Sequence, residues 1–185
     1  MAGEQLIIKA LVKYARGDGN VDILEIEEPF WGENQVKIEV AFCGVCGTDI
    51  LVLHDTLRSY PPVTLGHELS GKVVELGRNV TGVALGDTVT VVGATAVTCG
   101  HCPYCRSGRF MFCPNRREMG HGLNGAFTRY VVVRPDQVYH LPAGLALEEA
   151  ALCEPFAAAV QAVTEVTTVR IGATALISGP GPFGL

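Results

Sequence analysis

Four cysteines in one short stretch carry the strongest chemical signal of this 185-residue sequence. The pattern C-x2-C-x2-C-x7-C places them at Cys99, Cys102, Cys105 and Cys113. Four thiolates this close in sequence can bind one tetrahedral Zn²⁺ from a single loop. Glycines and prolines interrupt the stretch and favour a loop over a helix or strand. We therefore predict a loop lobe folded around a closed, structural zinc site.

Disulfides and an iron–sulfur cluster are the alternative uses of these cysteines. Disulfide frameworks are typical of small secreted proteins, and this sequence does not begin with the basic and apolar regions of a signal peptide. Iron–sulfur clusters usually have their own cysteine spacing, which this run only approaches. Zinc is therefore the favoured interpretation. A four-cysteine zinc site does not by itself indicate an activity.

A second group of metal-binding residue types consists of Cys46, His67 and Glu68. Cys46 lies on a glycine-rich turn after a predicted strand, and His67 stands at the start of the next one. Adjacent turns can bring such residues to one ion and leave coordination positions open, as in catalytic zinc sites. The third ligand must come from further along the chain, where Glu154 is the best candidate and Cys153 its rival. Taken singly, a loop histidine and packed cysteines need no metal.

A glycine motif near the end of the sequence follows an apolar run. Residues 173–178 (ATALIS) are predicted to form a buried parallel strand. Gly179, Gly181 and Gly184 then follow the G-x-G-x-x-G pattern of a dinucleotide-binding turn. Such a turn lets the backbone approach a pyrophosphate at a helix N-terminus. On its own the motif is weak, because the helix and the ribose-binding acidic residue would lie beyond Leu185.

The elements that must position these residues are predicted to be mainly β-strands. Short apolar or alternating segments separated by turns favour an antiparallel, barrel-like fold. The predicted strands are 6–13, 21–26, 35–42, 68–76, 87–92, 126–133 and 137–141. The turn at 17–20 predicts a hairpin between the first two. Residues 147–166 are rich in helix formers, and Pro155 is expected to begin the second of two helices.

Composition and charge limit the partners. With 48% hydrophobic residues the chain can bury a core, and its net charge of −5 is a poor match for nucleic-acid phosphates. Four arginines near the cysteine lobe are interpreted as a solvated rim. We predict no nucleic-acid partner and no membrane span, because no apolar run is long enough. Seven cysteines without a targeting signal favour the reducing cytoplasm.

Together these segments resemble the N-terminal part of the zinc-dependent medium-chain dehydrogenases, the superfamily of alcohol, polyol and threonine dehydrogenases. The resemblance covers essentially the whole chain, and its motifs occur in the family's order. They are CGVCGTD at 43–49, GHELSG at 66–71, CGHCPYCRSGRFMFC at 99–113, GAFTRYVVV at 125–133, EP at 154–155 and GPGPFG at 179–184.

The resemblance implies a fold and a set of roles. It implies a GroES-like zinc-binding domain over 1–155, followed at 156–185 by a connecting helix and the start of a Rossmann domain. Cys46 and His67 would bind a catalytic zinc, with Glu68 as a further or exchanging ligand and Glu154 at the position where polyol and threonine dehydrogenases place a glutamate. Thr48 would relay the substrate proton, and Asp49 would support His67.

The implied activity is NAD- or NADP-dependent oxidation of a secondary alcohol, of a polyol or a hydroxy amino acid, to a ketone. Other members have a histidine close after the relay residue. Here position 51 is leucine, so His54 is the nearest candidate. The expected partners are a small alcohol and, in the intact protein, further copies of the chain.

Because most of the Rossmann domain is missing from the sequence, we expect a fragment that binds zinc without turnover. The first alternative is a non-catalytic zinc-binding scaffold. A zinc-free reductase of the same superfamily fits less well, because such members generally lack the four-cysteine lobe.

Overall fold

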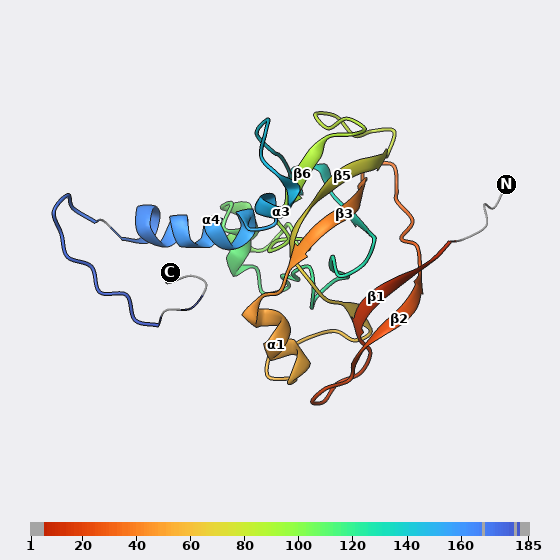
Figure 1. Cartoon of the computed structure of the whole chain (residues 1–185), viewed down its shortest axis with the longest axis horizontal. Coiled ribbons are helices and arrows are strands. Elements are labelled where there is room, and N and C mark those ends of the chain that lie inside the picture. The colour runs from red at the N-terminus through yellow and green to blue at the C-terminus, as the bar shows by residue number, and fades with distance from the viewer. Residues whose placement is uncertain (1–5, 168, 180, 182–185) are drawn as a thin grey trace.

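The computed structural model of the chain describes residues 6–167, 169–179 and 181. Its strands form two antiparallel sheets with the orders β2-β1-β4 and β7-β3-β5-β6-β8 (Figure 1). The strands are β1 Ile7–Lys13, β2 Val21–Glu27, β3 Val36–Gly44, β4 Val63–Thr64, β5 Glu68–Leu76, β6 Thr88–Val91, β7 Tyr130–Val133 and β8 Val138–His140. The mainly β, antiparallel architecture predicted from the sequence is confirmed, but its strands form two open sheets and not one closed barrel.

The core lies on the five-stranded sheet, where the central strands β3 and β5 pair along their whole length. Val36, Ile38, Leu69 and Val73 are fully or almost fully buried there. Apolar side chains at alternate positions of a strand point to one face, so this pairing builds a continuous apolar layer. The pairing also sets Gly44 opposite Glu68 at the end of the ladder, which fixes where the metal-type residues begin.

Most predicted elements are found close to their predicted bounds. The hairpin of β1 and β2 is formed, while the two-residue strand β4 was not predicted. Pro155 lies in the first turn of α4 (Cys153–Gln161), where a proline removes no helical hydrogen bond. The domain boundary predicted after residue 155 falls within this helix.

The predicted strand at 173–178 is wrong, because these residues form no strand and Leu176 and Ile177 are largely exposed. A parallel strand needs neighbours to pair with, and the described part of the chain provides none at this point.

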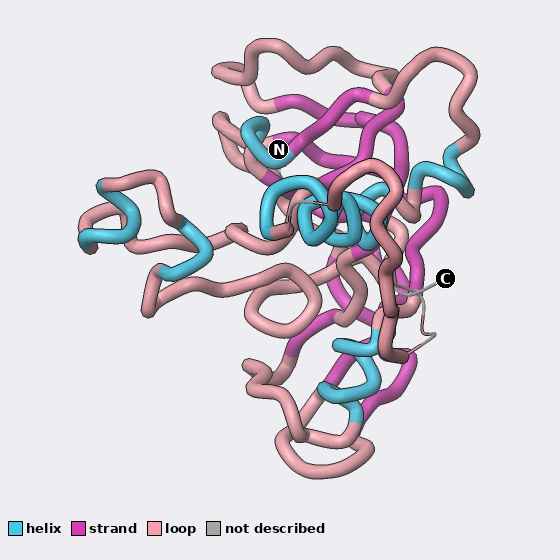
Figure 2. Tube along the Cα trace, turned by 90° about the vertical axis from the view of Figure 1, so that its left-hand side faces the viewer, coloured by secondary structure: helices cyan, strands magenta, loops and turns pink. Residues whose placement is uncertain are grey.

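The helices are short, and Figure 2 shows them in cyan, separate from the strands in magenta. They are α1 Gly47–Leu53, α2 Pro103–Arg106, α3 Leu147–Ala150 and α4, with 3-10 turns at Phe110–Phe112 and Pro135–Gln137 and a π-helical turn at Ala162–Val166. In the described part of the chain, none of them has the length and apolar character needed to cross a membrane.

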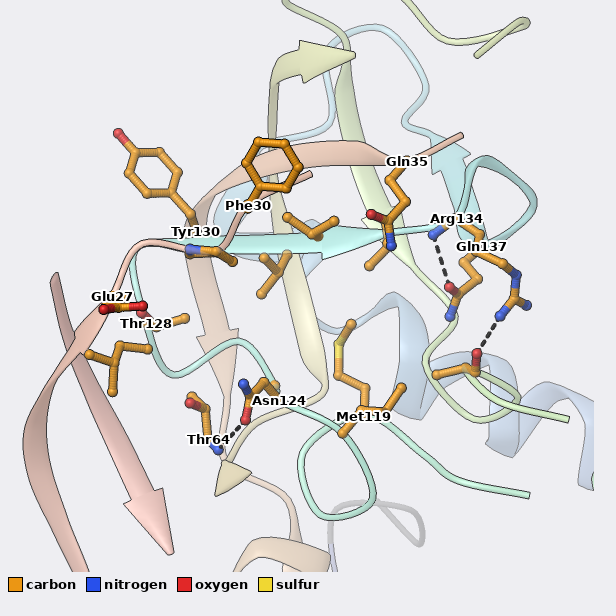
Figure 3. A pocket seen from close by; sticks show the side chains of 18 residues that line it. Glu27, Phe30, Gln35, Thr64, Met119, Asn124, Thr128, Tyr130, Arg134 and Gln137 are labelled. Atoms are coloured by element: carbon orange, nitrogen blue, oxygen red, sulfur yellow. Dashed lines mark hydrogen bonds between the residues drawn. The ribbon is translucent and has the colours of Figure 1, made fainter. Parts of the chain in front are cut away.

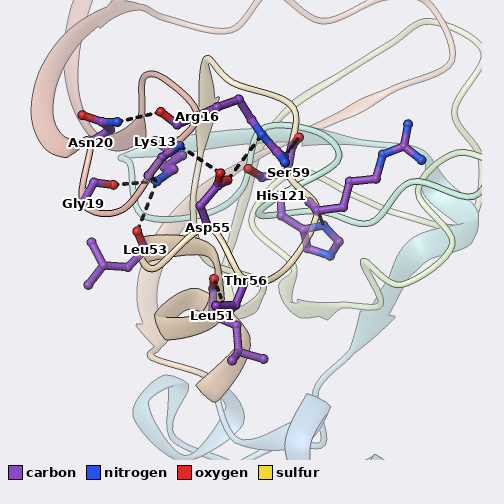
Figure 4. A network of polar contacts seen from close by, with 12 residues as sticks. Lys13, Arg16, Gly19, Asn20, Leu51, Leu53, Asp55, Thr56, Ser59 and His121 are labelled. Carbon is purple, nitrogen blue, oxygen red and sulfur yellow. Dashed lines mark hydrogen bonds and ion pairs between the residues drawn. The ribbon is translucent and has the colours of Figure 1, made fainter.

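A buried lysine ties the far end of α1 to the first hairpin (Figure 4). The ammonium of Lys13, which has no exposed surface, donates to the carbonyl oxygens of Gly17, Gly19 and Leu53. Its distances to the oxygens of Gly19 and Leu53 are 2.6 and 3.1 Å. A buried charge is tolerated when its hydrogen bonds are made. Lys13 therefore fixes the C-terminal end of the helix whose N-terminus carries Cys46.

Candidate functional site

The four cysteines of the lobe come together as their spacing predicted. Their sulfur atoms all lie within 4.8 Å of one another, and Cys105 and Cys113 are buried. The sulfurs of Cys99 and Cys105 are 3.9 Å apart, and all seven cysteines of the chain are free thiols. The donor set is that of a closed tetrahedral zinc site. Its two short helical turns stand off the body of the molecule at the left of Figure 2.

Backbone hydrogen bonds favour the thiolate form at Cys99, whereas burial raises the pKa of the Cys105 thiol to about 11. The amide of Cys105 donates to the sulfur of Cys102 at 3.4 Å, and the amide of Cys99 donates to the sulfur of Cys113 at the same distance. Hydrogen bonds from the amides of His101 and Cys102 lower the pKa of Cys99 to about 6. Amide hydrogen bonds stabilise thiolates, and a thiolate is the form that binds metal.

The second group converges from three different elements. Ligand atoms of Cys46, His67 and Glu68 lie within 4.8 Å of one another. Cys46 is the N-cap residue of α1, His67 occupies the turn before β5, and Glu68 is the first residue of that strand. At Gly44, opposite Glu68, a Cβ atom would lie 2.5 Å from a carboxylate oxygen of Glu68. Glycine at this position is therefore what allows the carboxylate to turn toward the group.

Asp49 connects the two turns that carry Cys46 and His67. One carboxylate oxygen accepts from the amide of Cys46 at 2.9 Å, and the other accepts from the amide of Gly66 at 3.2 Å. Asp49 is buried. The carboxylate thus holds the backbones of both turns, whereas the sequence led us to expect support of the His67 ring itself. This clamp fixes the spacing of the group.

The His67 ring leaves one nitrogen for an additional partner. Its Nδ1 atom is buried and has no hydrogen-bond partner in the described structure. Buried polar atoms normally have a partner, so an unpaired one needs an explanation. One thiol, one imidazole and one carboxylate whose ligand atoms lie within 4.8 Å of one another are a donor set that zinc accepts in an open site. The residues therefore fit a bound zinc ion.

A hollow of about 190 Å³ opens beside Cys46 and His67 of this group, and we call it the metal hollow. It is lined by Cys46, Thr48, His67, Gly93, Ala94, Glu118, Met119, Glu154 and Ala158. Glu154 reaches it from the first turn of α4, whereas Cys153 is not among the lining residues. Burial raises the pKa of Glu154, and the nearby Glu68 and Glu118 raise it further against the effect of His67.

Thr48 lines the metal hollow beside Cys46. Burial raises the pKa of the Cys46 thiol, and hydrogen bonds from the backbone and side chain of Thr48 partly offset this shift. Thr48 therefore acts directly on the sulfur of the group. Its hydroxyl can both donate and accept a hydrogen bond.

His54 and the predicted glycine motif do not belong to this group. His54 is the C-cap residue of α1, at the end opposite Cys46, and its Nδ1 atom is paired with Asp18 at 2.8 Å. The structure does not bring it to the metal hollow. Gly179 has a φ of +92°, and its carbonyl accepts from the amide of Gly181 at 2.9 Å, also away from the metal hollow. Gly184 lies outside the described residues.

Glu118 is the lining residue that the sequence did not reveal. Its carboxylate is paired with Arg116 and, at 3.3 Å, with Nε2 of His121. Arg116, predicted to belong to a solvated rim, is therefore half-buried in an ion pair. The sequence hints at this ion pair only through Arg116, two residues before Glu118, and His121, three residues after it. This spacing does not indicate which way the Glu118 side chain points.

A larger hollow contains none of this chemistry. About 380 Å³ lies between β7 and the segment that joins β2 to β3, where Phe30, Met119 and Arg134 are among the lining residues (Figure 3). No cysteine or histidine lines it. Volume alone therefore does not locate the candidate site, whereas the convergence of ligand types does.

Comparison with known proteins agrees with these features. The family model described as alcohol dehydrogenase GroES-like domain matches residues 32–143. A sorbitol dehydrogenase of Halalkalibacterium halodurans is 44% identical over 181 residues, covering 96% of this chain and 51% of that protein. An L-threonine 3-dehydrogenase of Aliivibrio fischeri is 35% identical over 182 residues, covering 96% and 52%. The chain thus spans about half the length of these relatives.

Solved structures of the same kind share the fold. The 2R,3R-butanediol dehydrogenase from Bacillus subtilis matches with a TM-score of 0.82 and 34% identity over 96% of this chain and 52% of that one. A zinc-binding dehydrogenase from Sinorhizobium meliloti 1021, bound to NADP, matches with a TM-score of 0.78 and 36% identity over 85% and 45%.

Proposed function

Because the chain belongs to the alcohol dehydrogenase GroES-like domain family, we propose that it is the zinc-binding catalytic part of an NAD- or NADP-dependent dehydrogenase. Its reaction is the oxidation of a secondary alcohol, in a polyol or a hydroxy amino acid, to a ketone. One observation carries this proposal: ligand atoms of Cys46, His67 and Glu68 lie within 4.8 Å of one another, and Cys46 and His67 line the hollow that Thr48 and Glu154 also line.

The chain would hold two zinc ions in different ways. Cys99, Cys102, Cys105 and Cys113 would hold a structural ion. Cys46 and His67 would hold the catalytic one, with a carboxylate oxygen of Glu68 within 4.8 Å of their ligand atoms. Glu154 is proposed as the further ligand in preference to Cys153, because Glu154 lines the metal hollow.

The residues in and around the metal hollow have different roles in the proposed reaction. A zinc ion at this site, when bound, supplies a Lewis acid that lowers the pKa of an alcohol hydroxyl, and the nicotinamide is the hydride acceptor. Thr48 takes the hydroxyl proton at its Oγ atom and passes its own proton outward. Asp49 keeps the turns of Cys46 and His67 at a fixed separation through its two amide contacts. Met119 and Ala158 contribute apolar surface to the metal hollow.

We also propose a domain division, a compartment and an oligomeric state for the whole protein. Gly179, Gly181 and Gly184 would begin the dinucleotide-binding turn of a domain that starts at residue 156 and continues past Leu185. Residues 1–155 would form the zinc-binding domain. The protein would act in the cytoplasm as a homo-oligomer, in keeping with seven unpaired cysteines and a reducing compartment.

Zinc content of the purified 185-residue chain tests the metal assignment. We expect two zinc ions per chain, and one in the Cys46→Ser, His67→Ala double variant. Glu154→Ala should weaken binding of the second ion, whereas the neighbouring Cys153→Ala should leave it unchanged. A single zinc ion in the wild-type chain, unaffected by the double substitution, would support the scaffold alternative and refute the catalytic site.

A further inference from the structure

We propose that Glu118 selects the substrate: its carboxylate accepts a hydrogen bond from a second, neighbouring hydroxyl of an uncharged polyol. This inference rests on the proposed function, and it narrows the substrate to neutral diols and polyols. The sequence did not place Glu118 at the site, and Glu118 does not belong to the group whose ligand atoms lie within 4.8 Å of one another.

The backbone of Glu118 is held rigidly. Its carbonyl oxygen accepts from the amides of Gly122 and Leu123, each at 2.9 Å. A Cβ atom at Gly122 would lie within 2.9 Å of the amide nitrogen and carbonyl oxygen of Glu118, so only glycine permits this turn. The next residue, Met119, is buried and donates to the carbonyl of Gly93 at 3.1 Å. A residue anchored on both sides can present its side chain to the metal hollow in one position.

The carboxylate of Glu118 is held by Arg116 and His121. Arg116 contacts one oxygen and also donates to the carbonyl of Ala94 at 2.9 Å, so its guanidinium is fixed. Nε2 of His121 lies 3.3 Å from the other oxygen, while Nδ1 lies 3.2 Å from the carbonyl oxygen of Arg58. Both ring nitrogens of His121 thus face oxygen atoms. These contacts lower the pKa of Glu118, with the His121 hydrogen bond as the largest cause.

An ionised carboxylate can accept about four hydrogen bonds, so Arg116 and His121 leave lone pairs of Glu118 free. Only about a quarter of the Glu118 side chain (28%) is exposed, and it lines the metal hollow with Cys46, Thr48 and His67. A substrate whose secondary hydroxyl meets those residues would place its neighbouring group near Glu118. A hydroxyl there donates to the carboxylate, whereas a carboxylate or phosphate would face Glu118 and Glu154 and be repelled.

A matched set of three-carbon probes tests this inference on the 185-residue chain. 1,2-Propanediol and lactate share a secondary alcohol and differ in a hydroxymethyl or carboxylate group beside it, and 1-amino-2-propanol carries an amine there. Binding is followed by the visible absorption of the cobalt(II)-substituted chain. The signal of the open site is obtained by subtracting the spectrum of the Cys46→Ser, His67→Ala variant.

We expect 1,2-propanediol to perturb the wild-type spectrum, and lactate to do so only at much higher concentration. Glu118→Gln should weaken binding of the diol about tenfold, as loss of a hydrogen bond to a charged group does, and should strengthen binding of lactate. Glu118→Asp, which keeps the charge but shortens its reach, should weaken the diol and still exclude lactate. Glu148→Gln, at an exposed glutamate of α3, is the matched control and should change neither.

The two proposals fail in distinguishable ways. If cobalt gives no signal that depends on Cys46 and His67, the proposed catalytic site is wrong. If that signal is present but the diol does not perturb it, or if Glu118→Gln shifts diol and lactate binding equally, the role of Glu118 is refuted. If Glu118→Gln changes the binding of 1-amino-2-propanol only, the favoured substrate is an amino alcohol and not a polyol, which would overturn the assignment.

Discussion

The two metal-type clusters of this chain are built in opposite ways. The four-cysteine lobe takes all its donors from one loop, and backbone amides of the same loop contact the sulfurs. The group of Cys46, His67 and Glu68 takes its donors from the start of α1, from the turn that holds His67 and from the first residue of β5. Asp49 holds the turns of Cys46 and His67 together through their backbone amides. A site made by one loop depends on local sequence, whereas a site made by several elements depends on the whole fold. The two should therefore respond to different substitutions.

The largest effect is expected from loss of a buried thiol of the lobe. Cys105→Ser removes one donor of a site whose metal contributes directly to folding. We expect loss of one zinc ion and a fall in Tm of about 10 °C, because about 3–5 kcal/mol corresponds to that shift in a domain of this size. Calorimetry and zinc analysis measure both. Retention of two zinc ions with an unchanged Tm would show that the lobe does not need its metal.

A smaller effect, confined to the other cluster, is expected from Lys13→Met. The substitution leaves the carbonyls of Gly17, Gly19 and Leu53 without their buried donor, which should cost about 3 kcal/mol. Since α1 carries Cys46 at its opposite end, the zinc of the open site should bind more weakly while the lobe retains its own. Urea unfolding and zinc competition with a chelator provide the readouts. Equal weakening at both sites would argue against a local role of Lys13.

Asp49→Asn tests the clamp with little change in shape. An amide can accept from only one of the two backbone N–H groups and turns its own N–H₂ toward the other. We expect a loss of about 1–3 kcal/mol in stability and a 10- to 100-fold loss of affinity at the open site. The lobe serves as the internal control in the same chelator competition. Unchanged affinity at the open site would mean that the clamp does not set its geometry.

The smallest effect is expected from His54→Ala. His54 is exposed and pairs with Asp18 on the hairpin turn, away from both clusters. Exposed ion pairs contribute little, so zinc content, Tm and chelator affinity should stay at their wild-type values. A loss of zinc from the open site would restore His54 to the candidate site from which the structure removes it.

The same contrast explains what the sequence could predict. The lobe was recognisable because spacing alone brings its cysteines together, and the hairpin and central strands followed from alternation and turn residues. The sequence also indicated Cys46, His67 and Glu68 as a group. It could not indicate that Asp49 binds two backbone amides, because that depends on how the turn at Gly66 approaches α1.

Two further differences have the same origin. Glu118 could not be placed at the metal hollow, because nothing local sets the direction of its side chain. Residues 173–178 have the composition of a buried strand, but composition cannot supply the neighbouring strands that pairing requires.

Zinc release to an excess of chelator tests the comparison of the two clusters most directly. The account predicts two phases of equal amplitude, with the open site releasing first because its coordination is incomplete and it faces a hollow. The fast phase should be absent from the Cys46→Ser, His67→Ala variant, and the slow phase from Cys105→Ser. A single phase, or a fast phase that persists in the double variant, would contradict the assignment of one closed and one open zinc site.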